Sequence, residues 1–174
     1  MARLAAWLGL ALLLFAGLAA PATAAVDIAF YSRELGGNNF PHAFVVIDGT
    51  IDATGERVHA SYGFTAKAIT PAILFGSVAG EVIDESPRQV ERSTRQFDLV
   101  LTDDQYRAVM ATMQQWRDRQ QPSYNLNRRN CVHFVASLAE ASGLRVDYPR
   151  RLMKRPRSYL EHIRDLNPRL VARR

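Results

Sequence analysis

The single cysteine of the chain occupies a position suited to a nucleophile. Cys131 follows Asn130 and opens an apolar helical pattern, which places its thiol at a predicted helix N-terminus. The free N–H groups and the positive end of the helix dipole stabilise a thiolate there and lower the thiol pKa. The same N–H groups are suited to hold the oxyanion that forms when a thiolate attacks a carbonyl carbon. The alternative interpretation is a buried cysteine on the apolar face of this helix.

Two histidines are candidates for the groups that activate this thiol. His42 immediately precedes a buried, β-branched strand at 43–47, where a neutral imidazole can accept the thiol proton and later return it to a leaving group. His59 lies on the predicted return strand. It shares a sheet face with His42 in any antiparallel register whose paired residue numbers have an odd sum, so we predict that it orients the base. The alternatives are a strand-edge histidine bonded to the backbone and a surface histidine.

Tyr124 and Asn130 are predicted to support the oxyanion beside the N–H of Cys131. Packing of the turn is the alternative for Tyr124, and capping of the helix is the favoured alternative for Asn130. This chemistry requires no metal and no organic cofactor. A metal site formed by His42, His59 and Cys131 is a further alternative, but their spacing lacks the close ligand pairs usual for zinc.

The elements that position these residues follow from the hydrophobic pattern. Strands are predicted at 26–32, 43–47, 56–62, 80–84 and 96–101. A helix begins after Thr102, where Gln105 completes a capping box, and a second helix runs from Asn130 to a stop at Gly143. A third, short helix is predicted from 157 to 166, and the segment 64–93 is largely unassigned. These elements predict an α+β fold, a small antiparallel sheet with packed helices.

Composition and the N-terminus indicate one exported globular domain. The chain has 174 residues, of which 48% are hydrophobic and 22% charged, and these values exclude a disordered chain and a multi-span membrane protein. Arg3, an apolar run over 4–20 and the pattern Ala22-Thr23-Ala24 predict a secretory signal peptide over 1–24, with an uncleaved anchor as the alternative. We therefore expect the periplasm, or secretion, and a catalytic domain over 25–146.

The charge is concentrated near the C-terminus. The chain carries a net charge of +5, and residues 147–174 hold nine Lys or Arg against three Asp or Glu. This segment is predicted to be a basic helix and tail, suited to an anionic surface such as a cell wall or membrane, with a solvated helix as the alternative. Nucleic acid is not an expected partner because aromatic residues do not interleave with the basic ones. The sequence does not indicate an oligomeric state.

The segment from Tyr124 to Val135, which reads YNLNRRNCVHFV, resembles the cysteine motif of the lecithin:retinol acyltransferase-like proteins. Those proteins belong to the circularly permuted branch of the papain-like NlpC superfamily of cysteine hydrolases, in which the catalytic histidine precedes the cysteine. The stretch 42–49, HAFVVIDG, is similar to the histidine strand of that family. The resemblance implies a permuted papain-like fold, with His59 as the third catalytic residue. Val132 departs from the motif, which has Glu at this position.

The resemblance also implies thiol chemistry on an amide or ester carbonyl through an acyl-enzyme. Together with the predicted export, it favours a cysteine peptidase or amidase that cleaves a peptide of the cell wall. The alternatives are a lipid acyltransferase or esterase, which the motif also favours, and a non-catalytic periplasmic binding protein on the same scaffold.

Overall fold

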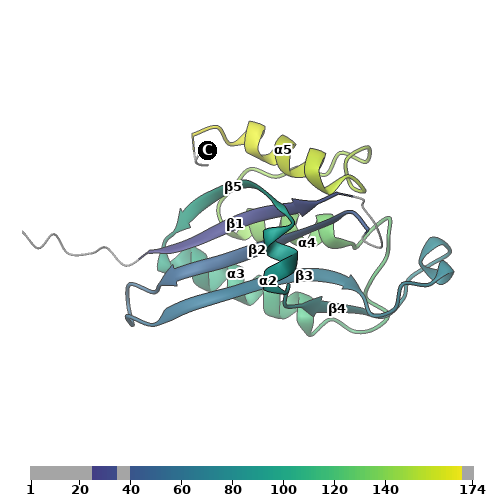
Figure 1. Ribbon diagram of the computed structural model, residues 1–174, viewed down its shortest axis with the longest axis horizontal. Coiled ribbons are helices and arrows are strands. Elements are labelled where there is room, and N and C mark those ends of the chain that lie inside the picture. Colours follow the sequence, from purple (N-terminus) through teal and green to yellow (C-terminus); the bar gives the residue numbers. More distant parts are fainter. Residues whose placement is uncertain (1–24, 35–39, 170–174) are drawn as a thin grey trace, which may run out of the picture.

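The computed structural model describes residues 25–34 and 40–169, and the predicted signal peptide lies outside them. Its centre is a five-stranded sheet with the order β4-β3-β2-β1-β5, in which every neighbouring pair is antiparallel (Figure 1). The strands are β1 (Val26–Arg33), β2 (His42–Thr50), β3 (Arg57–Ala66), β4 (Gly80–Ile83) and β5 (Thr94–Leu101). All five predicted strands are present, with ends that differ by at most four residues.

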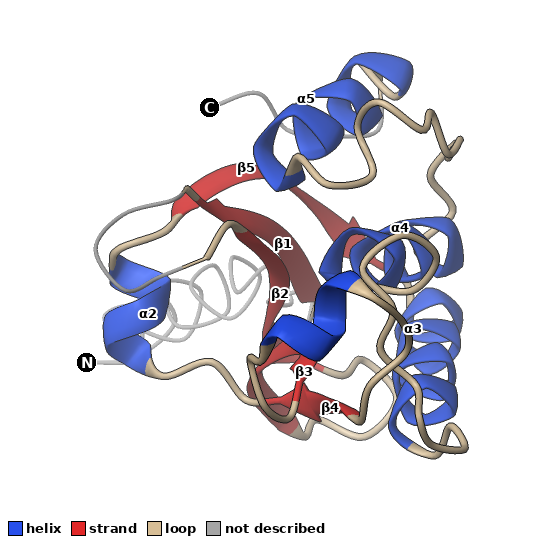
Figure 2. Cartoon of the chain, turned by 90° about the vertical axis from the view of Figure 1, so that its right-hand side faces the viewer, coloured by secondary structure: helices blue, strands red, loops and turns tan. Residues whose placement is uncertain are grey.

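Helices cover both faces of the sheet unequally. Three helices pack on one face: α3 (Asp103–Arg117), α4 (Cys131–Ala141) and α5 (Pro156–Leu166). The short helix α2 (Pro87–Glu91) lies on the opposite side of the sheet, as Figure 2 shows. A single 3₁₀ turn, η1 (Pro71–Leu74), lies in the long connection between β3 and β4. The predicted α+β class, a small antiparallel sheet with packed helices, is confirmed.

Alternation along the central strand divides the sheet into a core face and a site face. Successive side chains of a strand point to opposite faces of the sheet, so Ala43, Val45 and Ile47 of β2 share one face. They are fully buried beneath α4. On the same face, Phe64 packs edge-on to Trp116 of α3, with ring centroids 4.9 Å apart. The intervening residues of β2, beginning with His42, belong to the other face. His42 is the first residue of the strand, so it stands at the end of the sheet where α4 begins.

The predicted helix signals are confirmed. Thr102 and Gln105 form both hydrogen bonds of the capping box at the start of α3. Beyond α4, Gly143 adopts φ +85°, and the N–H of Leu144 donates to the carbonyl of Ala139 at 3.0 Å. This left-handed residue ends the helix, since only glycine takes that conformation without a steric penalty.

The C-terminal segment belongs to the same core. Tyr159, Leu160 and Ile163 of α5 are fully buried, and the Tyr159 hydroxyl donates to the carbonyl of Asp147 at 3.0 Å. Residues 147–169 are therefore packed against the sheet, with their basic residues left on the outside, rather than attached as a solvated tail. Within the described ranges, no helix has the length and apolar character needed to cross a bilayer.

Candidate active site

Cys131 is the first residue of α4 and is 8% exposed, beneath the end of the sheet. Asn130 caps this helix: its side-chain oxygen accepts from the N–H groups of Val132 and His133, at 2.9 and 3.3 Å. Among the described residues, none accepts a hydrogen bond from the N–H of Cys131 itself. This one donor therefore stays available at the helix tip, next to the sulfur.

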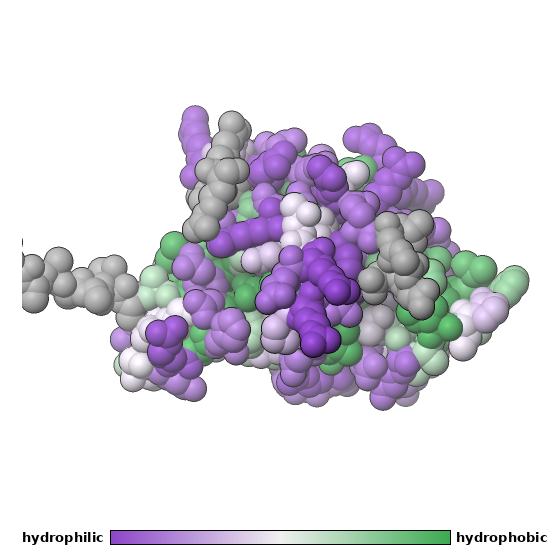
Figure 3. Space-filling view, viewed as in Figure 1, coloured by the Kyte–Doolittle hydropathy of each residue, from purple (hydrophilic) through white to green (hydrophobic). Residues whose placement is uncertain are grey.

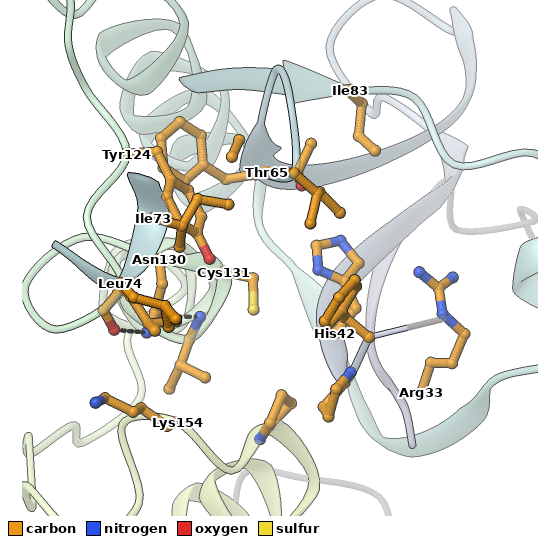
Figure 4. Close-up of a pocket in the computed structure, with 18 of the residues that line it drawn as sticks. Arg33, His42, Thr65, Ile73, Leu74, Ile83, Tyr124, Asn130, Cys131 and Lys154 are labelled. Atoms are coloured by element: carbon orange, nitrogen blue, oxygen red, sulfur yellow. Dashed lines mark hydrogen bonds between the residues drawn. The ribbon is translucent and has the colours of Figure 1, made fainter. Parts of the chain in front are cut away.

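The sulfur and the imidazole of His42 face one another across the end of the sheet, as Figure 4 shows. Burial raises the pKa of the Cys131 thiol, but the hydrogen bond and charge of His42, with backbone N–H groups at Ala43 and Val132, lower it overall. Burial lowers the pKa of His42, but the hydrogen bond and charge of Cys131, followed by those of Glu85, raise it to about 9. The two shifts together favour a thiolate paired with an imidazolium.

Glu85 is the third member of this cluster. Its Oε1 lies 2.9 Å from Nε2 of His42, and its Oε2 lies 3.6 Å from a guanidinium nitrogen of Arg33. Burial raises the pKa of Glu85, and the hydrogen bond and charge of His42, followed by the charge of Arg33, lower it overall. Among the described residues, neither Nε2 nor Oε1 has another polar partner, and the close contact between them joins opposite charges. With Nε2 turned to the carboxylate, Nδ1 is left for the sulfur.

Gly63 makes room for the pair formed by His42 and Glu85. Gly63 lies on β3, opposite Phe44 of β2. A Cβ at residue 63 would lie 2.6 Å from Nε2 of His42 and 2.7 Å from Oε1 of Glu85. Real Cβ atoms do not approach polar atoms this closely. The absence of a side chain at residue 63 is therefore what allows imidazole and carboxylate to meet over the sheet.

The structure does not bring His59 to this cluster. The register pairs even-numbered residues of β2 with odd-numbered residues of β3, so His59 shares the sheet face of His42. However, His59 lies opposite Asp48, six residues along the strand from His42. Its side chain is 78% exposed and its Nδ1 lies 2.8 Å from the Asp48 carboxylate. The acidic group of Glu85 stands where the sequence had placed a second histidine.

Tyr124 and Asn130 differ in what they can offer a reacting carbonyl. Asn130 is fully engaged, since besides its capping role its Nδ2 donates to the carbonyls of Leu126 and Met153, both at 2.8 Å. Capping is thus the arrangement observed. The Tyr124 hydroxyl borders the cleft, and burial together with the charge of Cys131 raises its pKa to about 12. It therefore keeps its proton at neutral pH and can donate.

A cleft of about 650 Å³ opens on the sulfur. Its polar lining comes from Arg33, His42, Thr65, Thr70, Gln89, Tyr124 and Asn130, while Lys154 lies at the margin drawn in Figure 4. The apolar part of the wall is larger and consists of Phe40, Pro41, Phe64, Ala66, Ile69, Pro71, Ile73, Leu74, Ile83, Leu126, Val132 and Pro156. The cleft thus combines a small charged end with long apolar sides.

No residue set in the described chain has the composition of a metal site. Within residues 25–34 and 40–169, no group of three His, Cys, Asp or Glu side chains is gathered closely enough to hold an ion. His42, His59 and Cys131, considered above as ligands, do not converge. The chemistry that the arrangement can perform by itself is nucleophilic attack by a thiolate, with acid and base roles for His42.

Comparisons with known proteins find one weak structural similarity among the matches considered. A scan against models of protein families and a search of curated proteins find no match. Among solved structures, the chain is similar to the Type VI secretion system effector TseH, at 16% identity and a TM-score of 0.49, over 82% of this chain and 89% of that one.

Proposed function

We propose that the protein is a cysteine hydrolase that cleaves an amide or ester bond through an acyl-enzyme on Cys131. The observation that carries the proposal is the buried sequence of contacts from sulfur to imidazole to carboxylate, built from the start of α4, the start of β2 and the segment after β4. Such a chain of nucleophile, base and orienting group is the arrangement that activates thiols in enzymes.

The steps follow from the geometry. The thiolate attacks the carbonyl carbon, a sulfur–carbon bond forms, and the carbonyl electron pair moves to the oxygen. The N–H of Cys131 and the hydroxyl of Tyr124 donate to that oxyanion. As the bond to the leaving group breaks, the imidazolium of His42 gives it a proton. Water then attacks the thioester, His42 accepts its proton, and the acid is released as the thiolate forms again.

Two substrate classes are candidates. A peptide amide of the cell wall is the first, supported by the predicted export and by a basic surface suited to an anionic polymer. A lipid acyl group is the second, and the apolar walls of the cleft favour it, because a saturated chain gains free energy there while a polar muropeptide would leave its hydrogen-bonding groups unpaired. The proposed location remains the periplasm or the exterior.

The test uses the one cysteine of the chain. Wild type and Cys131→Ala are incubated in parallel with purified muropeptides and with a phospholipid ester, and the products are identified by mass spectrometry. We expect turnover of one class by wild type and none by the variant. The intact mass of the wild-type protein, quenched early, should show an acyl group on Cys131.

His133→Ala is the matched control for loss of a half-buried polar side chain close to the site. Turnover that persists in Cys131→Ala would refute the proposal. If wild type turns over neither class and Cys131 does not react with iodoacetamide at neutral pH, the results would support a non-catalytic binding protein instead.

A further inference from the structure

The connection between β3 and β4 projects from the body of the protein and carries its apolar side chains outward. We call residues 67–79, which contain η1, the apolar arm. Its exposed fractions are 60% at Ile69, 69% at Leu74 and 87% at Phe75, and η1 has no buried residue. The arm is the projection at the right of Figure 1, and Figure 3 shows a mainly hydrophobic surface at that place. The arm contains no acidic residue.

The base of the arm is held firmly. The N–H of Lys67 donates to the carbonyl of Ala79 at 2.9 Å, which closes the arm on itself. Val78 and Tyr124 exchange two backbone hydrogen bonds, at 2.9 and 3.0 Å, which fasten the arm to the segment that leads to the nucleophile. An anchored loop with three large apolar side chains in water is costly unless something covers its tip.

Positive charge borders the same opening. The loop before α5 carries Arg150, Arg151, Lys154 and Arg155, all exposed, and no carboxylate in the described chain forms an ion pair with them. Lys154 lines the cleft together with Leu74 of the arm and with Phe40, which is 58% exposed. The apolar tip and the cationic loop therefore stand on two sides of one cleft.

We infer that this end of the molecule docks on an anionic lipid bilayer, with Ile69, Leu74 and Phe75 inserted at the level of the headgroups and the cationic loop on the lipid phosphates. A convex apolar tip beside unpaired cations matches the two layers of such a surface, acyl chains beneath and negative charge above. In this orientation the cleft opens toward the membrane. The inference does not depend on chemistry at Cys131, and it is tested without turnover.

The test follows the arm tip directly. In the full chain with Cys131→Ala, the substitution Phe75→Cys gives a single thiol at the tip, which is labelled with an environment-sensitive dye. Val100→Cys in the same background is the matched control, because Val100 is 61% exposed but lies on β5, away from the arm. Vesicles contain equal parts of phosphatidylglycerol and phosphatidylcholine, or phosphatidylcholine alone.

We expect a blue shift of the tip dye with anionic vesicles, quenching by lipids that carry a spin label near the headgroup, and no shift at position 100. Leu74→Ser in the unlabelled chain should weaken vesicle binding about tenfold, since that side chain would no longer enter the bilayer. Replacement of Lys154 and Arg155 by Gln should weaken binding to anionic vesicles and leave the weak binding to neutral ones unchanged.

Two results would overturn the inference. One is a tip dye that responds no more than the dye at position 100, which would mean that any attachment to vesicles occurs elsewhere in the chain. The other is a tip dye that shifts without lipid as protein concentration rises, in step with dimer formation in analytical ultracentrifugation, which would identify a second copy as the partner of the arm.

Discussion

Replacement of Glu85 by glutamine tests whether this carboxylate raises the pKa of His42 and thereby favours the thiolate of Cys131. The substitution keeps the shape of the side chain and removes a charge that lies 2.9 Å from Nε2 of His42. An opposite charge at such a distance shifts a pKa by about 1–3 units. The guanidinium of Arg33, 3.6 Å from the other carboxylate oxygen, then loses its partner and repels the imidazolium, which acts in the same direction.

The expected size follows from the pKa of His42, which is about 9 in the native protein. A fall of about 2 units, the middle of the range for such a charge, reduces the imidazolium fraction at pH 8 by about tenfold. Fewer imidazolium groups mean a higher thiol pKa and fewer thiolates. Alkylation of Cys131 by iodoacetamide, followed by intact mass from pH 5 to 10, measures this without knowledge of the substrate, because the chain has no second cysteine.

Glu56→Gln serves as the control, since Glu56 is exposed at the far end of the β2–β3 hairpin and should alkylate like wild type. The argument fails if Glu85→Gln has the wild-type pH profile while its thermal unfolding shows an intact fold. Glu85 would then be a buried partner of Arg33 with no influence on the thiol.

Three further substitutions test other parts of the site. Gly63→Ala should lower turnover about a hundredfold, because the new Cβ displaces the imidazole, whereas Gly76→Ala has open space and should retain activity; equal activities would refute this. Asn130→Ala should lower the free energy of unfolding by about 2–4 kcal/mol in urea denaturation, from a lost cap and buried carbonyls left unpaired, and Asn127→Ala should not. His59→Ala should keep at least half of the wild-type rate, and a loss beyond tenfold would restore it as a catalytic residue.

Local patterns were sufficient to find both members of the pair formed by Cys131 and His42. Cys131 could be placed at a helix start because the apolar repeat and the capping residue Asn130 are neighbours in sequence. His42 could be placed at a strand end because the buried run 43–47 follows it directly. Both inferences rest on short-range rules, since they ask only how a residue sits relative to its own element.

Glu85 and His59 show where such rules stop. Glu85 lies after a four-residue strand in a polar stretch, and it reaches His42 only because β4 pairs with β3. No local signal in the sequence distinguishes Glu85 from Asp84. The feature that singles out Glu85 is its contact with His42 over Gly63, which is visible only in the structure. For His59, periodicity predicted the correct sheet face but not the register, which the hairpin loop sets. In the observed register His59 lies opposite Asp48, six residues from His42, its expected neighbour.

Burial of this cluster links the ionisation of the proposed nucleophile to folding. The desolvation of three ionised groups is unfavourable for each alone, and it is offset only when all three are brought together. The raised pKa of His42 contributes stability that is complete below about 6.5 and is lost as pH rises through about 9, whereas the lowered pKa of Glu85 contributes stability that is lost in acid. Since the groups come from β2, from the segment after β4 and from α4, the thiolate becomes stable only in the completed fold. In the proposed mechanism, the sulfur of Cys131 is therefore a thiolate only where the sheet and the helix have already formed the cleft.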